Sequence, residues 1–321
     1  MTRPRIFVTA VPFASVTEDA PRLLTEAGLD FFTNPRDRTL TEAELSELVG
    51  ESDGVIAGTD PFSRAVIAAA PNLKIIARVG SGLDSVDLSA ARETGVLVTY
   101  TPEAPAPAVA ELAVCQMLAL LRDTYRCVNQ MRDKKWDRHT GRRLAEMKVG
   151  IIGAGRIGGR VINHLAAFGP PEIYVSDLRE PTELQLAAPV RQTDIDTIFR
   201  TCDVVSLHVP LNNATRGLAS AARLASMKEN AIMINTARGP VVDSAALAQV
   251  LRRRPDLSAA IDVFDVEPYS GELCELPNCF CTSHLGANTR DCRNRMEVEA
   301  AREIVRFFRQ EPPLHPAPAV V

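Results

Sequence analysis

Residues 149–161 read V-G-I-I-G-A-G-R-I-G-G-R-V, an apolar run that leads directly into closely spaced glycines. The apolar residues predict a buried strand over 148–153, and the residues after the glycines predict a helix over 156–168. Three glycines at this junction form the pattern G-x-G-x-x-G: Gly153, Gly155 and Gly158. The pattern is weak alone, because glycines also gather in ordinary turns, but between a strand and a helix it is typical of dinucleotide-binding folds.

The same glycines indicate how a dinucleotide would bind. Gly153 permits a tight turn, and Gly155 lets the backbone approach a pyrophosphate closely. Gly158 lets the helix pack closely against the sheet. The pyrophosphate is expected on the amides of Arg156 and Ile157, at the N-terminus of the helix. The next strand ends in Asp177, whose carboxylate would accept hydrogen bonds from ribose hydroxyls and repel a 2′-phosphate. The predicted cofactor is therefore NAD rather than NADP, although Arg179 would soften that preference.

Short apolar strands alternate with helical patterns along the chain, which predicts parallel sheets covered by helices on both faces, an α/β fold. One such series occupies about the first 100 residues, and a second begins at the glycine-rich turn. The proline-rich stretch T-P-E-A-P-A-P, residues 101–107, connects the two series. A single long helix is predicted over 108–132, and another over 291–310.

The composition argues against several classes of function. Net charge is -4 and the pI is about 5.8, with no long block of Lys or Arg, so neither nucleic acid nor an anionic membrane is expected as the main partner. No apolar run reaches the roughly 18 residues that a membrane span requires. Pro12 interrupts the apolar N-terminal stretch, which is therefore interpreted as a first strand rather than a signal peptide, and a cytoplasmic location is expected.

The seven cysteines are odd in number, form no C-x-x-C pair, and are expected to be reduced thiols. The stretch C-F-C-T-S-H, residues 279–284, raises the question of a metal site. A structural zinc site needs four N or S ligands, and no second Cys/His pair is evident, so no metal is predicted. The spacing of Cys279 and Cys281 instead places both on one face of a strand, where buried thiols act as small apolar groups.

Three polar runs follow predicted strands of the second series: residues 235–243, 260–268 and 283–288. Ligands of such sheets bind beyond the carboxyl ends of the strands, so Arg238, Glu267 and His284 are predicted to share one cleft. Arginine offers a planar fork for a carboxylate, histidine donates a proton, and a glutamate beside it favours the protonated imidazole. Singly these residues are as well explained as a surface ion pair, a buried histidine and a solvated carboxylate. Together they fit hydride transfer to a 2-keto acid.

The chain resembles the D-isomer-specific 2-hydroxyacid dehydrogenase family over essentially its whole length. Besides the runs above, the resemblance rests on R-V-G-S-G-L-D-S-V-D (78–87), A-V-A-E-L (108–112) and H-V-P-L (208–211). It implies an NAD-dependent oxidoreductase acting on 2-hydroxy acids, usually a homodimer, with Arg238, Glu267 and His284 as the catalytic residues. It also implies two Rossmann- or flavodoxin-like parallel-sheet domains with the active site in the cleft between them.

The resemblance also implies the bounds of the two domains and the residues that contact the substrate and the cofactor. The substrate-binding domain is expected over 1–101 plus 289–321, and the Rossmann domain over 102–288. Substrate contacts are expected at one loop and one catalytic residue: Arg78, Val79, Gly80, Ser81, Gly82 and Arg238. Asp262 is expected to meet the nicotinamide carboxamide, and the full set of cofactor contacts is Gly153, Gly155, Arg156, Ile157, Gly158, Asp177, Val209, Pro210, Thr236, Ala237, Arg238, Asp262, His284, Gly286 and Ala287.

Within the family, the short bacterial phosphoglycerate-dehydrogenase-like branch is the most similar, which favours a substrate with a second anionic group. Arg78 matches one arginine that animal-type phosphoglycerate dehydrogenases use for the phosphate, whereas Ala57 replaces another. Formate dehydrogenases share the fold but pair the histidine with glutamine, where this chain has Glu267. An NAD-binding co-repressor or regulatory protein of the same fold, without metabolic turnover, is the alternative from a different class.

Overall fold

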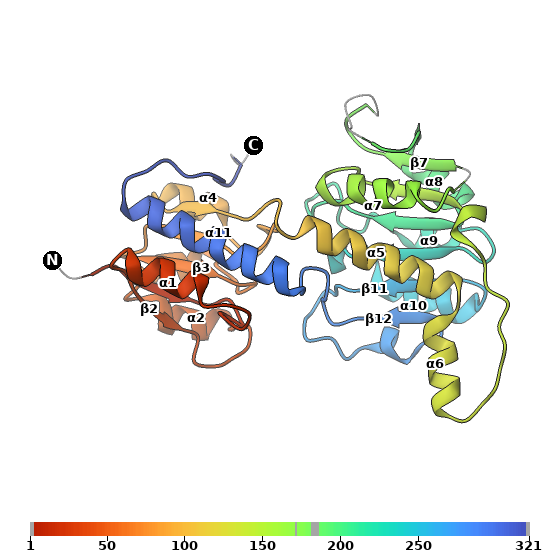
Figure 1. Cartoon of the computed structure of the whole chain (residues 1–321), viewed down its shortest axis with the longest axis horizontal. Coiled ribbons are helices and arrows are strands. Elements are labelled where there is room, and N and C mark those ends of the chain that lie inside the picture. Colours follow the sequence, from red (N-terminus) through yellow and green to blue (C-terminus); the bar gives the residue numbers. More distant parts are fainter. Residues whose placement is uncertain (1–2, 171, 181–185, 319–321) are drawn as a thin grey trace. The chain divides into compact units, whose positions relative to one another are not determined.

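The computed structural model describes residues 3–170, 172–180 and 186–318. The chain divides into two compact units, which are described separately. Unit 1 comprises Met1–Pro105 together with Ala287–Val321, and unit 2 is the uninterrupted run Ala106–Gly286. Each unit contains one parallel sheet with helices packed against it (Figure 1).

The sheet of unit 1 has the strand order β2-β1-β3-β4-β5, and every pairing is parallel. Its central strands are apolar on both faces, because residues on alternate sides pack against different helices. Ile6 and Ile75 lie with Ile304 of the last helix on one face, whereas Phe7 and Val55 belong to a cluster on the other. The strands are β1 (Arg5–Val8), β2 (Asp30–Thr33), β3 (Gly54–Ala57), β4 (Ile75–Arg78) and β5 (Leu97–Thr99).

Three helices of unit 1, namely α2, α3 and α4, begin at capping side chains. Thr41 and Glu44 form a reciprocal capping box at the start of α2, and Ser63 and Asp87 accept hydrogen bonds from the first turns of α3 and α4. Helices α1 and α11 pack against each other, although they come from opposite ends of the chain (Figure 1). The helices are α1 (Asp19–Glu26), α2 (Glu42–Val49), α3 (Arg64–Ala68), α4 (Leu88–Glu93) and α11 (Arg290–Phe308).

The sheet of unit 2 has the order β12-β11-β10-β9-β6-β7-β8, again with parallel pairings throughout. The order reverses at β6, the strand that leads into the glycine turn, which is where ligands of doubly wound sheets bind. The short edge strand β8 was not predicted. The strands are β6 (Lys148–Ile152), β7 (Glu172–Ser176), β8 (Arg191–Gln192), β9 (Val204–Leu207), β10 (Ile232–Asn235), β11 (Ser258–Ile261) and β12 (Cys279–Cys281).

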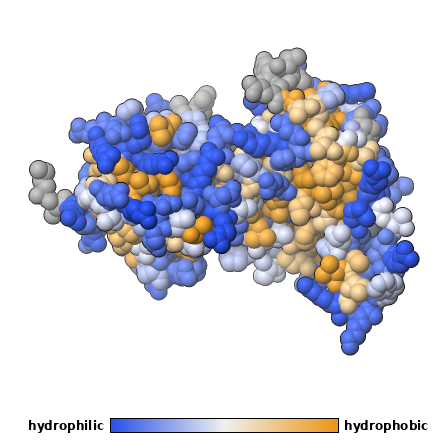
Figure 2. Space-filling model, in the orientation of Figure 1, coloured by the Kyte–Doolittle hydropathy of each residue, from blue (hydrophilic) through white to orange (hydrophobic). Residues whose placement is uncertain are grey.

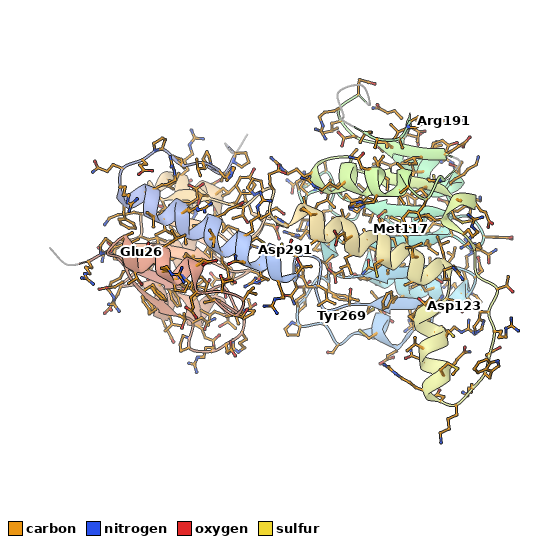
Figure 3. All side chains as sticks on the ribbon, in the orientation of Figure 1. Glu26, Met117, Asp123, Arg191, Tyr269 and Asp291 are labelled. Atoms are coloured by element: carbon orange, nitrogen blue, oxygen red, sulfur yellow. The ribbon has the colours of Figure 1, made fainter. Side chains whose placement is uncertain are left out.

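The helix predicted over 108–132 is wrong as a single element. The structure has two helices, α5 (Ala106–Leu121) and α6 (Thr124–Arg132), separated at Asp123 (Figure 3). Asp123 has a φ of 51°, in the left-handed region that aspartate tolerates better than most residues. Helix α5 carries ten buried residues and packs on α7, β10 and β11, whereas α6 buries none fully.

The remaining helical segments of unit 2 surround its sheet. Figure 2 shows hydrophobic residues gathered over α5 on the face drawn there. Within the described ranges, no helix is both long and apolar enough to cross a membrane. The segments are η1 (Leu144–Glu146), α7 (Arg156–Ala166), α8 (Ile195–Thr201), α9 (Ala221–Ala225), η3 (Gly239–Val241), α10 (Ser244–Arg253) and η4 (Glu272–Glu275). The predicted fold class, two parallel-sheet α/β domains, is confirmed.

Candidate active site

The glycine turn between β6 and α7 has the close contacts that its sequence predicted. Gly153 has a φ of 88°, and a Cβ there would lie 2.6 Å from the carbonyl oxygen of His208 on the neighbouring strand end. A Cβ at Gly158 would lie 1.9 Å from the carbonyl oxygen of Gly153, so only glycine lets α7 sit this close to the turn. Gly155, in contrast, has no neighbour within 4 Å, which leaves open space above the backbone.

This open space lies at the N-terminus of α7, where the backbone amides of Arg156 and Ile157 begin the helix. No side chain caps that end, because the N-cap residue is Gly155. Uncapped amides at a helix N-terminus bind phosphate through hydrogen bonds and the helix dipole. In the loop after β10, the hydroxyl of Thr236 is buried and has no hydrogen-bond partner among the described residues. The turn and this hydroxyl fit a dinucleotide.

Asp177, one residue beyond β7, is fixed against the glycine turn. Its Oδ2 accepts a hydrogen bond from the Ala154 amide (2.7 Å), and its Oδ1 accepts from the Arg179 amide (3.0 Å) and Arg179 Nε (3.2 Å). Partial burial opposes ionisation of Asp177, but these hydrogen bonds outweigh it, so the pKa lies below its usual value. The carboxylate is therefore charged at neutral pH. Arg179 partly neutralises it.

Asp262, directly after β11, organises the turn that carries His284. Its side chain is 1% exposed and accepts three hydrogen bonds: from the Thr282 hydroxyl (2.5 Å), the Leu285 amide (2.8 Å) and the Gly286 amide (2.9 Å). Its carbonyl oxygen also accepts from the His284 amide (2.9 Å). Residues 282–286 are thus held by one buried residue. This explains how His284 keeps a φ of 55°, which is unfavourable for a non-glycine residue.

His284 and Glu267 form a direct pair. Nδ1 of His284 lies 2.6 Å from Oε2 of Glu267, and the two side chains are 37% and 36% exposed. The other oxygen of Glu267 accepts from the Phe264 amide (3.0 Å). Burial of Glu267 raises its pKa. The hydrogen bonds with His284 and the Phe264 amide and the charge of Arg238 lower the pKa by more than burial raises it, so it lies below its usual value. The pair leaves Nε2 as the histidine nitrogen that Glu267 does not engage.

Arg238 follows β10 in a loop held by the side chain of Asn235. Asn235 is fully buried, donates to the Arg238 carbonyl (3.0 Å) and accepts from the Ala237 amide (3.1 Å). The guanidinium of Arg238 donates to the carbonyl of Ala237 (2.8 Å), and its charge acts on Glu267. The strand ends of unit 2 therefore bring the three predicted catalytic residues to the same edge of the sheet.

The predicted substrate loop belongs to unit 1 and follows β4. Arg78 is 7% exposed, and its Nη1 donates to the Val79 carbonyl. Gly80 has a φ of 137°, and a Cβ there would lie 2.5 Å from Arg78 Nη1, so the guanidinium lies against the loop backbone. Buried Asp60 is a charged neighbour of Arg78. The Gly80 amide donates to the Thr101 hydroxyl (2.8 Å), so this amide is already engaged.

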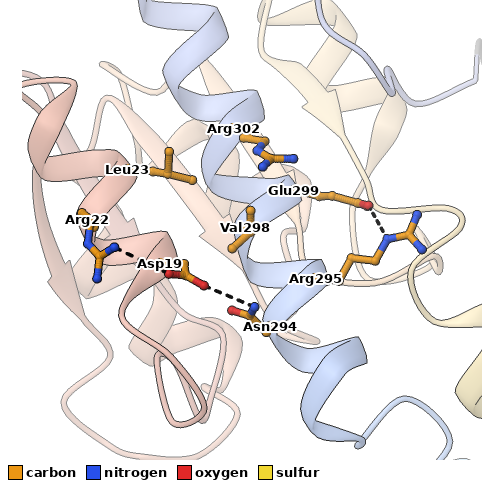
Figure 4. Close-up of a pocket in the computed structure, with 8 residues that line it drawn as sticks. All are labelled: Asp19, Arg22, Leu23, Asn294, Arg295, Val298, Glu299 and Arg302. Carbon is orange, nitrogen blue, oxygen red and sulfur yellow. Dashed lines mark hydrogen bonds and ion pairs between the residues drawn. The ribbon is translucent and has the colours of Figure 1, made fainter.

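A separate hollow lies between α1 and α11 of unit 1 and contains none of the predicted site residues (Figure 4). Its charged side chains are largely paired with one another: Arg22 with Asp19 at 3.9 Å and Arg295 with Glu299 at 2.7 Å. Within the part of the chain that the structure covers, no group of three or more His, Cys, Asp or Glu residues is arranged to hold a metal.

Comparison with known proteins identifies the family. Residues 114–286 match the model of the D-isomer specific 2-hydroxyacid dehydrogenase NAD binding domain. The chain belongs to this family. It is 38% identical to a hydroxypyruvate reductase of Thermotoga maritima over 272 residues, covering 83% of this chain and 88% of that protein. It is 33% identical to a glyoxylate reductase of Thermofilum pendens, covering 98% and 94%.

Solved structures agree with this assignment. An NAD⁺-bound 3-phosphoglycerate dehydrogenase of Entamoeba histolytica superposes with a TM-score of 0.83 at 26% identity, covering all of both chains. As a member of the 2-hydroxyacid dehydrogenase family, the chain is an NAD-dependent oxidoreductase acting on 2-hydroxy acids.

Family motifs alone did not indicate every residue that shapes the site. Asn235, which holds the Arg238 loop, and Thr282, which donates to Asp262, were not predicted. A polar residue that interrupts an apolar strand end was the available signal for Asn235. Asp262 was predicted to contact the cofactor, and what the structure shows is that it holds the turn that carries His284. Most of the other predicted cofactor residues lie in loops that follow strands of unit 2: Val209, Pro210, Ala237 and Gly286. Ala287 is the residue at which the chain returns to unit 1.

Proposed function

We propose that the chain reduces a 2-keto acid reversibly, with His284 as proton donor, Glu267 as its partner and Arg238 as the group that binds the carboxylate and polarises the carbonyl. The observation that carries the proposal is the 2.6 Å contact between His284 and Glu267, on a turn fixed by buried Asp262. A histidine placed in this way is a general acid with one nitrogen held and the other available. Unit 2 would hold the cofactor and unit 1 would contribute substrate contacts.

When bound, NADH supplies the hydride that reduces C2 of the keto acid. The chain's own residues handle the charge and the proton. Arg238 stabilises the negative charge that grows on the carbonyl oxygen. His284 donates the Nε2 proton to that oxygen, and Glu267 stabilises the charged imidazolium before the transfer. In the oxidation direction His284 takes the proton back from the hydroxyl group.

The direct test is NADH oxidation by the purified protein across 2-keto acids that differ in size and charge. Turnover of at least one keto acid is expected, with the D-hydroxy acid as product. No turnover of any keto acid, combined with measurable NADH binding, would contradict the proposal and would support the regulatory alternative. The relatives named above act on different acids, so their names do not decide which keto acid this chain reduces.

The Glu267→Gln variant is expected to change the pH dependence of keto-acid reduction. Wild-type Glu267 is ionised at neutral pH, because its pKa is lowered, and its negative charge lies against Nδ1 of His284. Glutamine keeps a hydrogen-bonding group but removes this charge, so positive charge at the site is stabilised less in the variant. The alkaline limb of the kcat/KM profile should therefore move to lower pH. An unchanged profile would contradict the pairing.

A second anionic group on the substrate is the finer part of the proposal. It is supported by the buried positive charge of Arg78, which lies against the backbone of the Val79–Gly82 loop. An anion bound on that loop would interact with this charge even though the guanidinium is buried, because burial reduces solvent screening. The competing explanation is that Arg78 only offsets buried Asp60.

The Arg78→Ala variant separates these explanations. A desolvated arginine–anion interaction is worth about 10–150-fold in kcat/KM, so turnover of a dianionic keto acid should fall by about that factor while pyruvate is barely affected. Equal losses for both acids would leave Arg78 with a structural role and remove the second anion from the proposal. The dehydrogenase assignment would stand in either case. Thermal unfolding of the variant shows whether the loss of a buried charge has destabilised unit 1.

We also propose that the chain forms a homodimer through α6 and the residues that follow it. Helix α6 buries no residue fully within its own chain, yet three large apolar side chains are exposed close together in sequence. Val128 and Met131 are each 49% exposed, and Trp136 is 80% exposed. A cluster of this kind indicates an interaction surface, and a second copy is the partner that family resemblance favours.

Replacing Met131 and Trp136 together with serine is expected to convert the dimer to a monomer. The change removes apolar area that dimerisation would bury, without altering the core of either unit. Light scattering coupled to size-exclusion chromatography gives the mass directly. Leu314→Ser, at an apolar residue of unit 1 that is 55% exposed, is the matched control and should stay dimeric. A monomeric wild type, or an unchanged mass in the double variant, would contradict the proposal.

A cytoplasmic location is proposed on the state of the cysteines. All seven lie within the described ranges and are free thiols, which is the form that a reducing compartment maintains. Localisation of a tagged protein by fractionation would test this.

A further inference from the structure

Helix α5 buries one polar side chain in an otherwise apolar surface. Of the ten residues that α5 buries, nine are apolar and the tenth is Gln116, whose exposed fraction is 0%. Its neighbours on the helix, Ala113, Met117 and Leu120, belong to the apolar cluster that α5 forms with β6, β10 and β11. Met117 is labelled on α5 in Figure 3. Burying an amide in such a cluster costs free energy unless the amide is hydrogen-bonded, so Gln116 calls for an explanation.

The side-chain nitrogen of Gln116 contacts the residue that follows β12. Nε2 donates to the hydroxyl of Thr282 (3.1 Å), and that hydroxyl donates to Oδ1 of Asp262 (2.5 Å). A hydroxyl has one proton, so once that proton lies on Asp262 the Thr282 oxygen can only accept from Gln116. This fixes which way the amide of Gln116 faces. Its oxygen is buried and has no hydrogen-bond partner among the described residues.

The same series of hydrogen bonds continues to the turn that carries His284. The side chain of Asp262 accepts from the amides of Leu285 and Gly286. Oδ1 of Asp262 accepts from both Thr282 and Leu285, so the Thr282 hydroxyl acts on the oxygen that holds the amide next to His284. His284 has a φ of 55°, which is unfavourable for a non-glycine residue. The turn therefore keeps this conformation only while the surrounding hydrogen bonds hold it.

We propose that Gln116 is a positioning residue for His284. It acts through Thr282 and Asp262 and contributes no group to the reaction itself. The inference rests on the proposed function, because positioning affects catalysis only if His284 donates the proton. Without the amide of Gln116, the Thr282 hydroxyl is free to rotate away from Asp262, and the turn can relax from its strained conformation. A general acid that is displaced by a fraction of an ångström transfers its proton more slowly.

The competing explanation is that Gln116 contributes only to the stability of unit 2. The two explanations differ in what they predict for Gln116→Leu. Leucine is apolar and similar in volume, and it removes the unpartnered amide oxygen, so the variant should pack at least as well in this cluster. A positioning role therefore predicts an unchanged or raised Tm together with a lower kcat. A role in stability alone predicts a lower Tm.

Hydrogen exchange measured by mass spectrometry tests the positioning role without any substrate. The amides of His284, Leu285 and Gly286 all donate to Asp262, so their exchange rates report the opening of the turn. In Gln116→Leu, peptides that contain these amides should exchange about 3–10-fold faster, the effect of one lost hydrogen bond. Peptides from the sheet of unit 1 should exchange as in the wild type. An unchanged rate at residues 284–286 would overturn the proposal, whatever His284 does in catalysis.

A double-mutant cycle tests whether Gln116 acts through His284. Single-turnover rates at saturating NADH and keto acid report the chemical step. Gln116→Leu should slow this step by about 10-fold in the wild-type background. In the His284→Asn background it should have no further effect, because the positioned group is absent. The same loss in both backgrounds would overturn the proposal. Normal turnover of His284→Asn alone would instead contradict the proposed function, and the exchange rates would still decide whether Gln116 holds the turn.

Variants of Thr282 reach the same contact from its other side. Thr282→Val keeps the shape and removes the hydroxyl, so exchange at residues 284–286 should rise as it does in Gln116→Leu. Adding Gln116→Leu to Thr282→Val should change the rate no further, and a full additional effect would overturn the proposal. Thr282→Ser retains a hydroxyl and should recover most of the protection. Gln249→Leu, the same change at an exposed glutamine on α10, is the matched control and should behave as the wild type.

Discussion

Replacing His284 with asparagine is expected to lower kcat for keto-acid reduction by about 10²–10⁴-fold. Asparagine retains a side-chain donor toward Glu267 but has no ionisable group to deliver a proton. The Kd for NADH should stay near the wild-type value, because the glycine turn and Asp177 are unchanged. Single-turnover kinetics with NADH fluorescence separates the chemical step from binding.

The control for this variant is His164→Asn. His164 is an exposed histidine on α7 of the same unit, and its replacement should leave kcat unchanged. Turnover of His284→Asn within a few-fold of the wild type would exclude His284 as the proton donor. A large loss of NADH affinity, with kcat preserved, would instead assign it to cofactor binding.

The Arg238→Ala variant is expected to lose about 10²–10³-fold in kcat and to show a raised KM for the keto acid. Both constants should change, because the same guanidinium binds the carboxylate and stabilises charge on the carbonyl oxygen. Arg238→Lys should recover part of the KM effect but little of kcat, since lysine keeps the charge and loses the planar fork.

Arg253→Ala is the matched control for this experiment. Arg253 is an exposed arginine at the end of α10 and should contribute nothing to either constant. A change in KM alone for Arg238→Ala would show that Arg238 contributes equally to ground state and transition state, which would contradict its role in polarising the carbonyl.

The sequence predicted the elements whose pattern is local and strong. The mostly apolar strands, such as β6 and β9, were identified because burial on both faces favours apolar residues. The break between α5 and α6 was missed, because residues on both sides have helical propensity and only the φ of Asp123 separates them. Strand β8, two exposed residues at a sheet edge, has no apolar pattern to detect.

The residues of the candidate site were also predicted only in part. Glycines and charged residues at strand ends were found by motif, because their chemistry requires particular residue types at particular spacings. Thr282, which donates to Asp262 from the end of a different strand, and Gln116, which donates to Thr282 from α5, depend on how the chain folds back on itself. Such contacts between elements are tertiary, and no spacing in the sequence specifies them.

The uninterrupted course of unit 2 has an evolutionary consequence. One stretch of gene encodes the glycine turn, Arg238, Glu267 and His284 together, whereas the Val79–Gly82 loop is encoded outside it. A recombination with two crossovers, near residues 105 and 286, would transfer the glycine turn and the three proposed catalytic residues together. The proposed substrate loop would be exchanged separately, with the segments that flank unit 2.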